Sequence, residues 1–384
     1  MQLKHFWVIG LFALNGFLLA QNSHQSKEIE VDFLVNYYQQ DGDHAAVTGG
    51  NGTEKLHDTA PMIIVNVPIG NNSLNVATGV DFYSSASSDN IDPIRSGASG
   101  SDARAYANVD YTINNASGNG SYGFLLGGSA EFDYTSFSFG GKWATASADD
   151  NRELALSGRM FFDRAQLIYP IELRNGTDWL SDGNRRTYNI SASYSQVLSQ
   201  RAQLSLMSDV VYQSGLLSTP FHRVYFTGET RPRVEKLPDS RLKIPVGARL
   251  NYYVNDWLIS RLYYRFYWDD FGIQANTAEI ELPVAINQSV SITPFYRYHK
   301  QSAADYYQPF GTHNPGDEFY TSDHDLSDFD SHKVGLGLRY YPVFGVADFG
   351  SLLMKRLDFR FSVYDRSDGL SAFSVGMGVS FIIK

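Results

Sequence analysis

Residues 357–383 read LDFRFSVYDRSDGLSAFSVGMGVSFII. Apolar side chains occupy the odd positions up to Val363, ionic or polar side chains fill the even ones, and a Ser-Asp-Gly turn follows at 367–369. Apolar residues then return at the odd positions from Phe373 to Phe381, against serine and glycine at the even ones. Because successive side chains of a β-strand point to opposite faces, the pattern predicts two strands with one apolar face each. Each is long enough for a tilted strand to cross a bilayer.

The same unit of alternating residues and a turn repeats along the chain back to Glu28. We therefore predict an all-β fold, a transmembrane antiparallel up-and-down β-barrel of about sixteen strands. The apolar phase flips between Tyr134 and Phe137, which indicates either a tight hairpin or a bulge, and a bulge would favour about fourteen strands. The predicted strands lie near residues 28–38, 61–69, 73–84, 103–113, 121–132, 135–147, 152–166, 187–198, 202–214, 241–254, 257–269, 275–286, 289–300, 332–342, 356–365 and 371–383.

The connections between these segments alternate in length. Short turns are expected at 70–72, 149–150, 199–201, 255–256 and 287–288. Long connections rich in Gly, Asp and Ser are expected near 39–60, 85–102, 167–186, 215–240 and 301–331. Short periplasmic turns and longer outer loops are typical of bacterial outer-membrane barrels. An even strand count then places both termini in the periplasm, with residues 28–384 forming a single barrel domain.

The beginning of the chain reads as an export signal. Residues 1–20 combine the basic Lys4, an apolar run over 6–19 and a small residue at the end, which is typical of a cleaved secretory signal peptide. Residues 21–27 would then be a short periplasmic segment. An N-terminal anchor helix is the alternative, but Asn15-Gly16 interrupts a run already short for a hydrocarbon core of about 30 Å.

Composition excludes several classes of protein. The chain has no cysteine, which rules out disulfides, thiolate metal sites and a lipoprotein anchor. A net charge of −10 argues against a nucleic-acid partner. No stretch after the signal approaches the roughly 18 apolar residues of a spanning helix. The mature chain is therefore expected to be either soluble or a barrel.

The placement of charge favours the barrel. A Lys or Arg on the lipid face costs roughly 2–4 kcal/mol at mid-membrane, and the apolar faces, such as that of 246–252, carry none. Aromatic residues such as Trp257 and Tyr340 lie near segment ends, where interfacial girdles occur. A secreted β-sandwich or β-solenoid remains the alternative, because alternation alone excludes neither.

With the apolar faces outward, most strand charges point into the lumen. The acidic ones come mainly from N-terminal strands and the basic ones from C-terminal strands, so the interior would be polarised. A transverse field of this kind would orient polar solutes in a porin-like channel, whereas paired charges would only brace the wall. The predicted lumen-lining residues are Glu30, Asp32, Asp81, Asp110, Arg159, Asp163, Asp209, Arg249, Arg261, Arg265, Glu279, Glu281, Arg297, His299, Arg339, Asp358 and Arg360.

Two outer loops contain clustered carboxylates and imidazoles. The first holds a candidate site for calcium or another divalent cation, although its spacing does not match a twelve-residue calcium loop. The loop at 301–331 holds an acidic cluster, either a solvated surface or a site bridged by calcium to lipopolysaccharide or a partner. The alternative function is therefore a non-enzymatic scaffold or receptor that binds a metal ion, glycan or protein. The first-loop candidates are Asp41, Asp43, His44, Glu54, His57 and Asp58.

A barrel enzyme would need a Ser/His or Asp/His arrangement at the rim. The candidates are His222, His299 and His332 with nearby Ser or Asp, and no G-x-S-x-G elbow accompanies them. We predict no enzyme activity and no resident cofactor. The expected partners are outer-membrane lipid, lipopolysaccharide and, during biogenesis, the barrel-assembly machinery.

Several phrases carry a family resemblance: DGDHAAVTGGNGTEKLHDTAPMIIVNVP at 41–68, TPFHRVYF at 219–226, LPDSRLKIPVGARLNYY at 237–253, LISRLYYRFYWDDFGI at 258–273 and ITPFYRYHKQSAADYY at 292–307. With SHKVGLGLRYYP at 331–342, they resemble the bacterial domain-of-unknown-function family 3570. The resemblance implies an outer-membrane barrel of a Gram-negative bacterium and carries over no established activity. It also implies a link to periplasmic redox proteins, through neighbouring flavin-transferase and thioredoxin-like genes.

Overall fold

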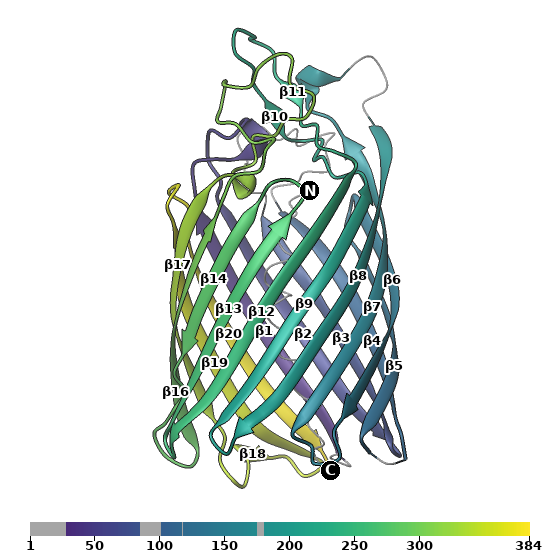
Figure 1. The fold of residues 1–384 in the computed structure, drawn as a ribbon, viewed down its shortest axis with the longest axis vertical. Helices are drawn as coiled ribbons and strands as arrows, with labels where there is room; N and C mark the ends of the chain where they lie inside the picture. Colours follow the sequence, from purple (N-terminus) through teal and green to yellow (C-terminus); the bar gives the residue numbers. More distant parts are fainter. Residues whose placement is uncertain (1–27, 85–100, 117, 175–179) are drawn as a thin grey trace.

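The protein is a closed antiparallel β-barrel, seen in a computed structural model that describes residues 28–84, 101–116, 118–174 and 180–384 (Figure 1). Sixteen long strands form the wall, which closes because β1 pairs with β20 as well as with β2. The wall strands are β1 (Ile29–Asp41), β2 (Leu56–Ile69), β3 (Asn72–Ser84), β4 (Ser101–Asn114), β5 (Gly120–Ala130), β6 (Tyr134–Ala146), β7 (Arg152–Ile168), β8 (Leu180–Ser199), β9 (Ala202–Gly215), β12 (Ser240–Asn255), β13 (Leu258–Asp269), β14 (Gln274–Glu281), β16 (Val290–Gln301), β17 (Phe329–Tyr340), β19 (Leu352–Arg366) and β20 (Ser371–Ile383).

Four two-residue strands complete the fold. β15 (Val284–Ala285) pairs with β13 and β16 below β14, and β18 (Ala347–Asp348) pairs with β19. β10 (Arg223–Val224) and β11 (Arg233–Val234) pair with each other above the wall. Within the described ranges, no helix is both long and apolar enough to span a membrane.

The structure confirms the sixteen-stranded barrel that the alternation predicted. The phase flip after residue 133 is a hairpin, because β5 and β6 pair along their length and the Glu131 amide donates to the Tyr134 carbonyl oxygen at 2.8 Å. Two strands start five or more residues earlier than predicted: β2 at Leu56 and β8 at Leu180. Alternating hydrophobicity marks only the part of a strand inside the apolar belt, whereas backbone pairing continues above it. Most of the predicted loop 85–102 lies outside the described residues.

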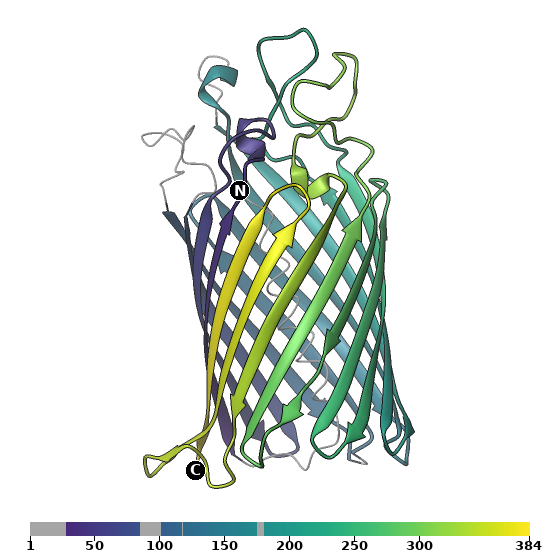
Figure 2. The ribbon, with the colours of Figure 1, turned by 90° about the vertical axis from the view of Figure 1, so that its left-hand side faces the viewer.

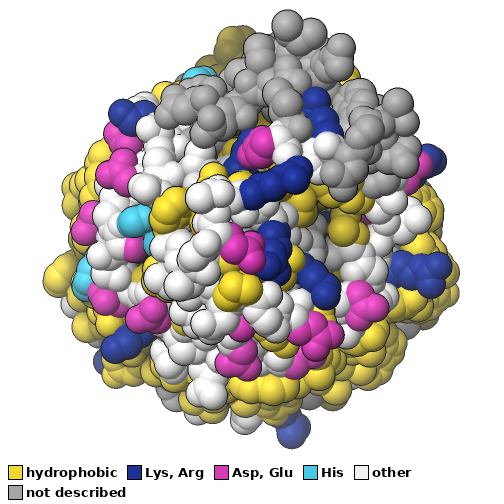
Figure 3. All heavy atoms as spheres, turned by 90° about the horizontal axis from the view of Figure 1, so that it is seen from above, with side chains coloured by type: hydrophobic (Ala, Val, Ile, Leu, Met, Phe, Trp, Pro, Cys, Tyr) yellow, Lys and Arg dark blue, Asp and Glu magenta, His cyan; other side chains and the backbone are white. Residues whose placement is uncertain are grey.

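The outer face of the wall is apolar. Large side chains at alternate positions, such as Phe33, Leu262, Leu336 and Phe361, are exposed on the outside of the barrel. Figure 3 shows hydrophobic side chains around the rim, with ionic side chains of both signs nearer the centre. An apolar surface that surrounds the whole wall is far larger than a soluble monomer exposes, and a closed barrel leaves no unpaired edge in lipid. The protein is therefore a transmembrane barrel of the outer-membrane type.

The two ends of the barrel differ. The lower end holds the C-terminus and the start of β1, which are paired at Ile29 and Ile383, together with short turns and one longer hairpin at 341–351 (Figures 1 and 2). The upper end carries the connections 42–55, 169–174, 216–239 and 302–328, which we call the crown. The described residues thus match the predicted asymmetry between short turns and long loops.

The crown is a folded layer rather than a set of separate loops. Val224, Phe226 and Tyr320 form a buried cluster that joins 216–239 to 302–328. Backbone bridges pair Phe226 with His313 and Lys236 with Tyr320. Arg223 extends to the first loop, where its Nη1 donates to the Val47 carbonyl oxygen at 2.5 Å. The crown therefore covers part of the upper mouth as one unit.

Candidate channel lumen

Side-chain contacts that skip strands identify the inner face of the wall. Arg360 on β19 donates to Glu281 on β14 at 2.8 Å, although β16 and β17 lie between these strands. Measured along the wall, this is three strand spacings, roughly 14 Å. Arg159 on β7 likewise donates to Asn108 on β4 at 2.6 Å, across β5 and β6. Only side chains on the concave face can shorten such a distance, so these four residues point inward.

Glu281 is paired with two of the basic side chains on the C-terminal strands. Besides Arg360, it is approached by Arg261 at 3.7 Å from the directly opposed position on β13. Glu279, two residues earlier on the same face, is held by Arg297 of β16 at 2.6 Å. Arg261 thus pairs with Glu281 across one strand pair, while Glu279 is paired with Arg297 from the other side of β14.

The acidic side chains of the N-terminal strands are also paired with basic ones. Lys142 lies 2.7 Å from Asp110, two strands away. Arg185 lies 2.9 Å from Asp163 in a buried pair. These two cations were missing from the sequence prediction. Lys142 occupies the inward phase of the predicted strand 135–147, so its signal was present in the sequence. Arg185 falls in the predicted loop 167–186, where no alternation marked it, because β8 begins earlier than predicted.

The other predicted lumen residues lie as follows. Glu30 is 3.7 Å from Lys355, Asp32 is 3.6 Å from Arg356, and Arg339 is 2.7 Å from Asp358. Asp81 is opposite Arg104 in the ladder, Asp209 accepts from Ser191, and Arg265 is opposite Thr277. The Arg249 guanidinium lies 5.4 Å from the Tyr263 ring centroid, and His299 Nδ1 is 2.9 Å from the Thr277 hydroxyl. Most of these charges therefore have a partner on the wall.

Glycines let several inward side chains lie flat on the wall. A Cβ at Gly127 would be 2.3 Å from Nη2 of Arg159, and a Cβ at Gly335 would be 2.3 Å from the Phe295 ring. The Arg360 guanidinium lies 4.0 Å from the centroid of that same ring. Glycine in a strand often marks such a close approach. The long side chains consequently lie along the wall instead of projecting across the interior.

Water reaches these inward side chains. Arg261, Arg339 and Arg360 are 45%, 54% and 49% exposed at their side chains although they make ion pairs inside the barrel. Exposed pairs of this kind contribute at most about 1 kcal/mol each to stability. Their arrangement therefore leaves charged groups available to a solute within the interior.

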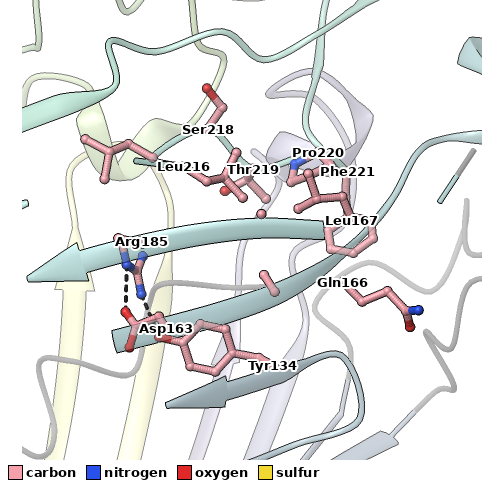
Figure 4. A pocket seen from close by; sticks show the side chains of 13 residues that line it. Tyr134, Asp163, Gln166, Leu167, Arg185, Leu216, Ser218, Thr219, Pro220 and Phe221 are labelled. Atoms are coloured by element: carbon pink, nitrogen blue, oxygen red, sulfur yellow. Dashed lines mark hydrogen bonds and ion pairs between the residues drawn. The ribbon is translucent and has the colours of Figure 1, made fainter. Parts of the chain in front are cut away.

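The β9–β12 connection narrows the upper mouth. Leu216, Pro220 and Phe221 fold over the inward face of β7 and β8 and leave a cleft with an empty volume of about 430 Å³, part of it open to solvent (Figure 4). The Arg185–Asp163 pair lies at its base, beside Tyr134. The cleft therefore lies between the start of this connection and the inner face of β7 and β8.

A buried carboxylate holds this connection to the rest of the crown. Glu235 accepts from the Thr219 backbone amide at 2.5 Å, from the Thr321 hydroxyl, and lies 3.2 Å from His222 Nδ1. The TPFHRVYF segment is therefore core of the crown. Of the other two histidine candidates for catalysis, His299 lies on the inner wall and His332 is exposed, so the three are not brought together.

The first-loop residues considered for a metal site are dispersed. Asp41 lies 3.3 Å from Lys55, and His44 stacks on His324 with ring centroids 4.0 Å apart. Glu54 and Asp58 are buried, and neither Asp43 nor His57 joins them in a cluster. Across the part of the chain that the structure describes, no three His, Asp or Glu side chains are grouped to hold a metal ion.

The acidic residues of 302–328 are used in local structure. The Asp323 carboxylate accepts from the Asp325 amide at 3.0 Å, and Asp325 is 2.7 Å from Arg366. Arg366 also contacts Asp368 in the β19–β20 turn. Burial favours a higher pKa for Asp368, but hydrogen bonds from His324 and Arg366 outweigh it and hold the pKa below its usual range. The cluster thus ties the crown to that turn.

Several solved outer-membrane proteins are similar to this chain. The siderophore receptor PirA from Acinetobacter baumannii has a TM-score of 0.47 and 10% identity, over 88% of this chain and 53% of the receptor, so the chain spans about half of that receptor's length. OpdK from Pseudomonas aeruginosa has a TM-score of 0.40 and 7% identity, over 92% and 98%. A deltaS2S3 mutant of the monoaromatic hydrocarbon channel TodX has a TM-score of 0.43 and 10% identity, over 94% and 91%.

No curated protein matches the sequence. A family match, in contrast, extends over nearly all of the barrel, from residue 18 to residue 369. It covers the crown segments as well as the wall strands, in agreement with the resemblance of the 41–68 and 219–226 segments. The chain therefore belongs to the family described as Protein of unknown function (DUF3570).

Proposed function

We propose that this outer-membrane barrel is a channel for small polar solutes. The observation that carries the proposal is the half-exposed ionic interior, in which Arg261, Arg339 and Arg360 are paired on the wall yet solvated. Glycines beneath the long side chains support it, because they keep those side chains off the axis.

The seventeen predicted lumen residues would divide the channel into two arcs. The basic side chains except Arg159 lie on β12 to β19, and Asp32, Asp81, Asp110, Asp163 and Asp209 lie on β1 to β9. A field directed across a narrow aqueous path orients a solute that carries separated charges. In the cell, we place the crown outside and both ends of the barrel chain in the periplasm.

The experiment uses the absence of cysteine from the chain. Alternation from Arg185 along β8 places Ser193 on the inner face and Ala192 on the outer face. In planar lipid bilayers, we expect folded protein to conduct in discrete steps. We also expect a water-soluble charged methanethiosulfonate to reduce the current of Ser193→Cys and to leave that of Ala192→Cys unchanged. Folded protein without conductance steps, or equal effects on the two variants, would contradict the channel.

A further inference from the structure

The longest connection at the lower end of the barrel exposes a set of apolar side chains. This hairpin, residues 341–351, joins β17 to β19 and contains β18. Val343 is 78% exposed, Phe344 is 92% exposed and Phe349 is 61% exposed. A rigid, uncovered patch of this kind on a protein surface usually marks a contact with another phase or molecule.

The exposure is built into the backbone of the hairpin. The Gly345 amide donates to the Pro342 carbonyl oxygen at 3.0 Å, which closes a turn with Val343 and Phe344 at its tip. Gly345 has φ of +79°, a conformation that favours glycine. The Lys384 ammonium lies 2.6 Å from Asp348, and the Lys384 amide donates to the Ser351 carbonyl oxygen at 2.9 Å. The tip is therefore held out by a fixed frame.

The hairpin lies where the apolar belt ends. Figure 2 shows it at the lower end, beside the C-terminus, reaching sideways beyond the wall of the barrel. It follows the outward row Leu336, Leu338 and Tyr340 of β17, which faces lipid. Its apolar tip thus continues a lipid-facing surface instead of lying under the lumen.

Cationic and aromatic side chains flank the tip. The Lys384 ammonium is half-exposed beside Asp348. The Lys355 ammonium lies 5.8 Å from the Tyr341 ring centroid and is also paired with Glu30 of the inner face at 3.7 Å. Lysine next to Tyr or Trp is the combination that anchors proteins at a membrane interface, since the ring enters the headgroup layer and the ammonium meets lipid phosphate. The lipid-facing row of β17 that leads into the hairpin, together with the half-exposed Lys384, favours a phospholipid surface over a protein as the occupant.

We propose that the tip of the 341–351 hairpin inserts into the phospholipid leaflet at the lower end of the barrel. Val343, Phe344 and Phe349 enter the boundary between headgroups and acyl chains, to a depth of about 5–10 Å as interfacial apolar groups do. Lys384 stays at the phosphate level. The contact acts as a lateral anchor outside the barrel wall, and it depends on the fold, not on the proposed channel.

The test places one environment-sensitive fluorophore on a single cysteine, which the cysteine-free chain permits. Phe344→Cys carries the probe at the tip, and Gln288→Cys carries it in the exposed β15–β16 turn at the same end. Both proteins are folded into phosphatidylethanolamine and phosphatidylglycerol vesicles with or without a nitroxide on the upper acyl chain. We expect lipid nitroxide to quench the Phe344 probe about twofold or more over the Gln288 probe, and aqueous iodide to quench it less.

Three outcomes would overturn the proposal. Equal quenching at the two positions would mean that the tip stays in water. Protection of the Phe344 probe from iodide without quenching by lipid nitroxide would mean that a second copy of the chain covers the tip. Val343→Cys places the probe on the same turn and serves if Phe344→Cys folds poorly. Either of these two quenching patterns at Val343→Cys would also reject the anchor.

Discussion

Single glycines determine how the inward side chains lie. Gly335 faces the lumen opposite Phe295, and an added Cβ would be 2.3 Å from the Phe295 ring and 2.5 Å from the Phe361 carbonyl oxygen. The ring cannot retreat freely, because the Arg360 guanidinium stacks on it. We expect Gly335→Ala to lower the free energy of unfolding by about 1–3 kcal/mol, as overpacking does, in a denaturant titration of the barrel in lipid vesicles.

Gly337 provides the matched control for this substitution. It lies on the same strand and the same face, but a Cβ there would be 3.5 Å from Thr293, which is ordinary contact. Gly337→Ala should therefore change the free energy of unfolding by much less than Gly335→Ala. Similar losses in both variants would show that a general intolerance of β17 to alanine, and not the packing of Phe295, decides the result.

At the scale of elements, the strands were predictable and the crown was not. Alternation located every wall strand, since one face of each must meet lipid and its period of two is local in sequence. The crown has no such period. In the core of the crown, the Thr321 hydroxyl donates to Glu235, although the two residues lie 86 positions apart in the sequence. Only the closed barrel brings their loops together. The inward parity of Lys142 was readable, whereas Arg185 lay in a predicted loop, and the pairing of both with Asp110 and Asp163 required the register.

The buried carboxylate of the crown gives a prediction at this scale. Glu235→Gln replaces an acceptor of three hydrogen bonds with an amide that has one acceptor oxygen, and unsatisfied buried groups cost about 1–3 kcal/mol each. We expect faster hydrogen exchange in 216–239 and 302–328, with exchange in the wall strands unchanged. Glu229→Gln is the control, because the Glu229–Arg233 pair is about one-third exposed and exposed pairs contribute little. Equal exchange in the two variants would remove Glu235 from this role.

At the scale of the whole barrel, the proposed channel is polarised between the bases of β12 to β19 and the acids of β1 to β9. If ions pass between these arcs, the loss of one inward base should favour cations. We expect Arg360→Gln to raise the cation-to-anion permeability ratio by about twofold, measured from the reversal potential in a KCl gradient, and more at 0.1 M than at 1 M salt because of screening.

The control for this whole-barrel prediction removes the same charge from the other face. Arg164 lies on the opposite phase of β7 from Arg159 and forms an exposed pair with Asp182 at 2.7 Å. Arg164→Gln should leave the reversal potential unchanged, since its charge is separated from the lumen by the wall. An equal shift in both variants would mean that net charge alone sets selectivity. No shift in Arg360→Gln would place the ion path away from the basic arc.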